Sequence, residues 1–140
     1  MVGILLITHN GLGDSFIDCL RHVLGVAPAH VKALSVLASD DPVAKEEEAR
    51  AMIAQLDDGQ GVLLLSDVYG ATPCNIAGRL CRPGRIEGVA GVNLPMLLRV
   101  ACYSNKPLEE LMQRALEGGK ECIVTIDSKG CDAATGCANH

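Results

Sequence analysis

Residues 2–8 of this chain read Val2-Gly3-Ile4-Leu5-Leu6-Ile7-Thr8, an apolar run without a single charge. A run of this length and composition is typical of a strand that is buried on both faces of a parallel sheet. It ends at His9, and a polar turn with two glycines follows over residues 10–14. Ligands of open α/β sheets bind at the carboxyl ends of the strands, so His9 stands where an imidazole with a chemical role is expected.

The rest of the chain alternates between further apolar runs and segments with helical spacing of apolar residues. We predict strands over residues 31–37, 61–66 and 86–92, and a short last strand over residues 121–126. We predict helices over residues 11–24, 42–56, 73–81, 94–103 and 108–116. This order predicts a three-layer α/β/α domain with a mainly parallel sheet.

The composition of the chain limits the classes of protein to which it can belong. The 140 residues suffice for one domain, and with 49% hydrophobic but only 2% aromatic residues the core must be aliphatic. The net charge is −5 and no block of Lys and Arg occurs, so nucleic-acid binding is not expected. No apolar stretch reaches the roughly 18 to 20 residues of a membrane span, and the N-terminus lacks the features of a signal peptide. We therefore expect a cytoplasmic protein.

The strand over residues 61–66 ends in a second chemically distinctive residue, Asp67. If the strands that precede His9 and Asp67 are adjacent, the two side chains can meet at the same edge of the sheet. A carboxylate that accepts the proton of one ring nitrogen fixes the tautomer and leaves the other nitrogen as a nucleophile. A strand-to-turn junction explains His9 alone, and a helix cap explains Asp67 alone, so only the two residues together indicate a chemical role.

The loop after Asp67 contains Gly70-Ala71-Thr72-Pro73. Backbone amides in this loop, and those around residues 11–14, could hold an anion such as a phosphoryl group, and Thr72 could donate a further hydrogen bond. Neither segment has a nucleotide-binding fingerprint. Residues 93–96 repeat the pattern of a strand end followed by a helix, and either closure of the same cleft or plain packing explains them. His22 and His30 are expected on the surface.

Three segments together resemble the mannose-type EIIA domain of the bacterial phosphoenolpyruvate-dependent sugar phosphotransferase system (PTS). The first is the apolar strand that ends in Thr8-His9, and the resemblance covers about residues 1–126. The other two are Gly61-Val62-Leu63-Leu64-Leu65-Ser66-Asp67-Val68-Tyr69-Gly70-Ala71-Thr72-Pro73-Cys74-Asn75 and Gly88-Val89-Ala90-Gly91-Val92-Asn93-Leu94-Pro95-Met96-Leu97. Their common order and spacing are more specific than any one of them.

The resemblance implies a role for each residue of the predicted site. His9 would accept a phosphoryl group from phospho-HPr and pass it to an EIIB component, a separate chain that serves a membrane sugar permease. Asp67 would hold the ring nitrogen that is not phosphorylated, and Thr72 would hydrogen-bond the phosphoryl group. No cofactor or metal is implied. Asn10 stands where the family often has glycine, and residues 68–69 replace a common Thr-Trp pair.

The resemblance also implies a four-stranded parallel sheet with a fifth, antiparallel strand that two subunits of a homodimer exchange. Residues 121–126 fit that strand, so residues 1–127 form the predicted EIIA domain. Residues 128–140, with Cys131 and Cys137, are expected to be a disordered tail.

Three other functions stay open at this point. The domain could be a regulatory EIIA whose phosphorylation state controls a partner protein. It could be the phosphotransferase subunit of a dihydroxyacetone kinase system. It could also be a metal-independent hydrolase or lyase that uses His9 and Asp67 as a base pair, although no Ser or Cys nucleophile occurs in an elbow-like context.

Overall fold

The computed structural model describes residues 1–127, and the tail expected over residues 128–140 lies outside the described part. The strands are β1 (Gly3–His9), β2 (Val31–Val36), β3 (Val62–Ser66) and β4 (Ile86–Ala90). The helices are α1 (Leu12–Leu24), α2 (Pro42–Leu56), α3 (Thr72–Leu80), α4 (Leu94–Cys102) and α5 (Leu108–Glu121). The predicted order of the first nine elements is therefore confirmed.

The four strands form one sheet in the order β2-β1-β3-β4, and every neighbouring pair is parallel. The central strand β1 pairs with β2 and with β3, with His9 opposite Val36 on one side and Ile7 opposite Ser66 on the other. The carboxyl ends of β1 and β3 consequently meet at the same edge of the sheet, as the positions of His9 and Asp67 in the sequence predicted.

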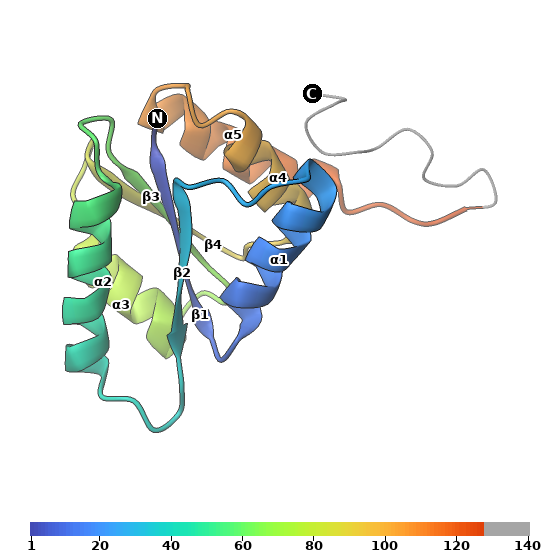
Figure 1. The fold of residues 1–140 in the computed structure, drawn as a ribbon. Helices are drawn as coiled ribbons and strands as arrows, with labels where there is room; N and C mark the ends of the chain where they lie inside the picture. The colour runs from blue at the N-terminus through green and yellow to red at the C-terminus, as the bar shows by residue number, and fades with distance from the viewer. Residues whose placement is uncertain (128–140) are drawn as a thin grey trace.

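Helices cover both faces of the sheet and give the predicted three layers (Figure 1). Alternate residues of β1 divide between two cores: Ile4 and Leu6 pack with residues of α1, α4 and α5, and Leu5 and Ile7 pack with residues of α2 and α3. All four side chains are fully buried, which explains why the strand carries no polar alternation. Among the described residues, no helix combines the length and apolar character that crossing a membrane requires.

Start and stop signals in the sequence match the observed helix ends. Gly25 ends α1 in the left-handed conformation, with φ +83°. The Asp41 side chain accepts a hydrogen bond from the amide of Val43 and caps α2, whose first residue is Pro42.

The predicted end of the last helix at Leu116 is wrong, because α5 continues through Gly118 and Gly119 to Glu121. The two glycines serve close packing of α5 on α4. A Cβ atom at Gly118 would lie 3.0 Å from Cδ of Arg99, and one at Gly119 would lie 2.7 Å from Cε of Met96. A glycine pair that reads as a helix stop is here the contact surface between two helices.

The predicted strand over residues 121–126 is not present in the single chain. Glu121 is the last residue of α5, and the residues that follow it up to position 127 form no strand. Ile123, Val124 and Ile126 are 76%, 72% and 85% exposed, so this apolar segment has no core to pack against within one copy of the chain.

His30 is not the surface residue that the sequence suggested, whereas His22 is exposed as expected. The Nε2 atom of His30 lies 2.7 Å from the hydroxyl of Ser104, which is only 1% exposed. Partial burial, and then the nearby N-terminal amino group, lower the pKa of His30 below its ordinary value of 6.5, against a smaller opposing contribution from a hydrogen bond with the backbone of Ala101.

Two glycine substitutions inside helices should have opposite effects on stability. A Cβ atom at Gly78 of α3 meets nothing within 4 Å, so Gly78→Ala should raise the free energy of unfolding by about 0.5–1 kcal/mol. Gly118→Ala should instead lower it by about 1–3 kcal/mol, because the methyl group crowds Arg99. Urea unfolding of both variants checks this, and equal effects would contradict the packing role of Gly118.

The lowered pKa of His30 leads us to predict how the free energy of unfolding depends on pH. The unfolded chain takes up a proton on His30 near pH 6.5 while the folded chain still resists it, so the free energy of unfolding should fall as the pH drops below 6.5. His30→Gln removes this contribution and should flatten the pH dependence in that window. Urea unfolding of both proteins between pH 7.5 and about 5.5 measures it, and parallel curves would refute the assignment.

Candidate functional site

His9 is the last residue of the central strand, and Asp67 follows the last residue of the neighbouring strand β3. The structure brings the two together by two contacts to one oxygen. The backbone amide of His9 donates to Oδ2 of Asp67 at 3.0 Å, and Nδ1 of the imidazole lies 2.8 Å from the same atom. The predicted pairing of these residues is thereby confirmed as geometry.

The carboxylate of Asp67 is the buried partner of this pair, with a side chain that is 7% exposed. Its other oxygen, Oδ1, accepts a hydrogen bond from the amide of Val68 at 3.0 Å. Burial alone would raise the pKa of Asp67, but the hydrogen bonds from the backbone and ring of His9 and the local amide outweigh it and lower the pKa. Asp67 is therefore a carboxylate at neutral pH.

A carboxylate only accepts hydrogen bonds, so the network assigns the proton of the neutral imidazole to Nδ1. The other ring nitrogen, Nε2, then carries the lone pair, and no described residue hydrogen-bonds to it. The His9 side chain is 47% exposed, whereas its partner is buried. The arrangement can deliver a nucleophile or base at Nε2, with a fixed negative charge behind the ring.

The turn after His9 depends on two residues whose roles the sequence analysis did not assign. Asn10 adopts a left-handed conformation with φ +49°, which Asn tolerates better than most residues other than Gly. Thr8 is fully buried, and its hydroxyl accepts a hydrogen bond from the amide of Gly13 at 2.9 Å. The expectation that amides around residues 11–14 hold an anion therefore fails for Gly13, whose amide is already occupied.

Thr72 lines the same cavity as His9. His9, Thr72 and Pro73 line a cavity of about 360 Å³ together with the end of β2 and the β2–α2 loop. Thr72 is the first residue of α3, and within residues 1–127 no side-chain hydrogen bond caps the N-terminus of this helix. The predicted site residue Thr72 and the start of α3 therefore lie at the same cavity as His9.

The β2–α2 loop contributes a carboxylate to this cavity that the sequence analysis did not single out. Asp40 lines the cavity, and its Oδ2 accepts a hydrogen bond from the amide of Leu37 at 2.7 Å. The sequence feature that could have indicated Asp40 is the acidic pair at positions 40 and 41, which follows a predicted strand. Only the second of these, Asp41, is the helix cap.

For Asn93 the sequence left two explanations open, closure of the cleft and plain packing, and the structure supports packing. Its Oδ1 accepts from the amide of Met96 at 3.0 Å and caps α4, and its Nδ2 donates to the carbonyl of Gly119 at 3.0 Å. It is not among the residues that line the cavity beside His9. Asn93 therefore joins α4 to α5 and does not close the cleft.

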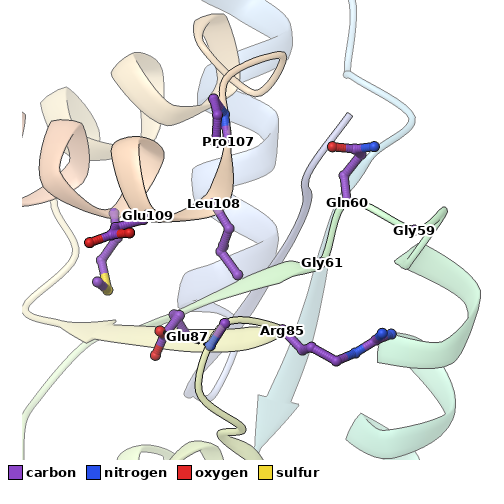
Figure 2. Close-up of a pocket in the computed structure, with 10 residues that line it drawn as sticks. Gly59, Gln60, Gly61, Arg85, Glu87, Pro107, Leu108 and Glu109 are labelled. Carbon is purple, nitrogen blue, oxygen red and sulfur yellow. Dashed lines mark hydrogen bonds between the residues drawn. The ribbon is translucent and has the colours of Figure 1, made fainter.

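A larger cavity, about 530 Å³, lies between the starts of β3, β4 and α5 (Figure 2). Much of its wall is formed by glycines 59, 61 and 84 and by Pro107, the residue that precedes α5. The side chain of Arg85 extends away from Leu108 and Glu87, and it pairs with Asp57 at 2.9 Å. This cavity shares no lining residue with the one beside His9. The larger of these two cavities is therefore not the one that the predicted site residues line.

Comparisons with known proteins place the chain among components of the phosphotransferase system. The chain is 28% identical over 136 residues to the PTS system mannose-specific EIIAB component of Escherichia coli K12, covering 95% of this chain and 42% of that protein. The chain thus spans less than half the length of this curated relative.

Among solved structures, the mannose/sorbose-specific IIA subunit of the phosphotransferase system from Enterococcus faecalis has a TM-score of 0.79 at 24% identity, over 90% of this chain and 95% of that one. The PTS IIA protein associated with the fucose utilization operon of Streptococcus pneumoniae has a TM-score of 0.68 at 25% identity, over 84% and 93%. The sequence profile described as PTS system fructose IIA component matches residues 3–116. The chain therefore belongs to the EIIA-man family of the phosphotransferase system.

Proposed function

We propose that this chain is a cytoplasmic phosphocarrier that accepts a phosphoryl group on Nε2 of His9 from phospho-HPr and passes it to an EIIB component. The observation that carries the proposal is the 2.8 Å contact between Nδ1 of His9 and the buried carboxylate of Asp67. It leaves Nε2 as the ring nitrogen that is available for reaction. Membership of the EIIA-man family supplies the class of donor and acceptor.

The transfer is a displacement at phosphorus. The lone pair of Nε2 forms the new nitrogen–phosphorus bond while the bond between phosphorus and the donor breaks, and the donor keeps that electron pair. The ring becomes positively charged as the bond forms, because Nδ1 keeps its proton. The carboxylate of Asp67 stabilises this charge without accepting the proton. Transfer to EIIB is the same displacement, with Nε2 as the leaving group.

Two features beside the imidazole support binding of the phosphoryl oxygens. The cavity of about 360 Å³ has room for the group next to His9. The hydroxyl of Thr72 and the uncapped first turn of α3 offer donors that compensate the negative charge of the oxygens. No step of this chemistry requires a metal ion on this chain.

Exposed apolar side chains surround the site and suit a protein partner. They come from the β1–α1, β2–α2 and β3–α3 connections and from the first turns of the helices that follow, and Tyr69, at 86%, is the most exposed of them. The others are Leu12, Leu37, Val43 and Val68. Apolar side chains at this density around a half-exposed histidine favour docking of a protein over capture of a free sugar.

The proposed function is tested by phosphorylation in solution. Incubation with phosphoenolpyruvate, enzyme I and HPr should give an acid-labile phosphate on the wild-type protein and none on His9→Ala. Asp67→Asn should slow labelling on the order of 100-fold, because the charge that stabilises the ring is lost. The ³¹P NMR spectrum should identify the Nε2 isomer.

His22→Ala is the matched control, since His22 is exposed on α1 and lies outside the cavity. It should be labelled like the wild type. Label that persists on His9→Ala, or wild-type protein that remains unlabelled, would refute the proposal. The hydrolase alternative predicts instead turnover that does not depend on HPr.

We also propose that two copies of the chain form a homodimer by exchanging the apolar segment at residues 122–126. The outer edge of β4 supports this, because among the described residues β4 has only β3 as a full neighbour in the sheet. An apolar hollow of about 130 Å³ between α3 and β4, lined by Leu64, Ala77 and Val89, lies beside this edge. The exposed side chains of Ile123, Val124 and Ile126 would cover it.

A charge in the exchanged segment should abolish this dimer. Val124→Asp should sediment as a monomer while the wild type sediments as a dimer, because burial of an unpaired carboxylate is unfavourable. Val26→Asp, at a 65% exposed position in the α1–β2 connection, should leave the dimer intact. Sedimentation velocity checks all three proteins, and a monomeric wild type would refute the dimer.

A further inference from the structure

The cavity that would receive the phosphoryl group has an unfavourable charge balance. Asp40 lines it directly, and Asp67 stands behind the imidazole. The described residues that line the cavity include neither Lys nor Arg. A phosphoryl group on His9 brings about two further negative charges at neutral pH. Thr72 and the first turn of α3 offer hydrogen-bond donors but no full positive charge, so a cation that offsets Asp40 has to come from outside the lining.

Lys45, in the first turns of α2, forms an ion pair with Asp40, the carboxylate that lines the cavity. Its Nζ lies 3.7 Å from Oδ2 of Asp40 and 3.1 Å from Oε2 of Glu48. The side chain is only 20% exposed, and that of Asp40 is 23% exposed. Partly buried pairs are screened less by salt than pairs on an open surface. Hydrogen bonding to Glu48, and then the charges of Glu48 and Asp40, raise the pKa of Lys45 against the effect of burial, so it stays charged.

We propose that Lys45 is a positioning residue that neutralises Asp40 and thereby sets how readily the His9 site holds a phosphoryl group. The inference deepens the proposed function and rests on it. Lys45 acts through Asp40 and needs no contact with the phosphoryl group. The Asp40 carboxylate stays at the cavity because it also accepts the amide of Leu37, which closes the β2–α2 loop. The fold thus requires an acceptor at position 40, and the charge that comes with it has to be offset.

The two carboxylates that Lys45 contacts provide an internal control. Asp40 lines the cavity, whereas Glu48 lies further along α2 and does not. Asn at position 40 retains an oxygen that can accept from Leu37 but loses the charge. If charge at the cavity is what Lys45 controls, removing the charge of Asp40 should replace the lysine, and removing that of Glu48 should not.

The test measures the equilibrium constant for phosphoryl transfer between phospho-HPr and each variant. Lys45→Met should lower the constant about 3- to 10-fold, the size expected for one partly screened charge. The double variant Lys45→Met/Asp40→Asn should return it to within about twofold of the wild type, by the same electrostatic argument. Lys45→Met/Glu48→Gln should stay low. Lys106→Met, in the α4–α5 connection at the opposite edge of the sheet, should not change it.

Each outcome decides a different point. Unchanged transfer in Lys45→Met, or equal rescue by both double variants, overturns the role of Lys45 while leaving the proposed function intact. Phosphoramidate, a small donor that phosphorylates histidine without a partner protein, separates the two proposals. If it labels His9 but HPr does not, the proposed donor is wrong, and the half-life of the phosphohistidine in Lys45→Met against Lys45→Met/Asp40→Asn still measures the charge effect. Equal half-lives, or no label from either donor, overturn the role of Lys45.

Discussion

The pairing of β1 on both sides is the constraint on which the rest of the structure depends. A strand with parallel neighbours on both edges and helices on both faces must be apolar along its whole buried length, and residues 4–7 are fully buried. Polar residues return at the carboxyl end of the strand, where Thr8 and His9 still pair with β2 but no longer with β3. The same pairing with β3 places Asp67 at that edge. The contact between His9 and Asp67 is therefore a consequence of the strand order.

Much of this could be predicted from the sequence, and the failures have physical causes. Apolar runs, Gly25, Asp41 and Pro42 carry local signals, so the first nine elements and most of their limits followed from them. The end of α5 did not, because Gly118 and Gly119 have the same local signature as a helix stop and only the approach of α4 explains them. The segment after Glu121 reads as a strand, but a strand needs a hydrogen-bonded neighbour, and the described residues of this segment pair with none.

Some residues of the candidate site could likewise be predicted from the sequence, and others could not. His9, Asp67 and Thr72 follow strand ends, a position that a linear pattern reveals, and the structure brings the first two into contact and the third to the same cavity. Thr8 and Asp40 were missed because their roles depend on hydrogen bonds to the amides of Gly13 and Leu37. Such bonds belong to the folded turn and leave no periodic signal. Residues that shape a turn are therefore harder to find from sequence than residues that react in it.

The single oxygen that binds both the backbone amide and the ring of His9 has a consequence for the speed of partner exchange. Two donors from one residue on one buried acceptor fix the torsion angles of the histidine side chain before any partner arrives. Docking then does not have to order this ring, a step that otherwise costs about 0.5–1.5 kcal/mol for a flexible side chain. Under the proposed function the chain meets a donor and an acceptor in turn, so the ordering cost is avoided at both encounters. Weak, short-lived complexes are then sufficient for productive contact, and rapid dissociation becomes compatible with efficient relay.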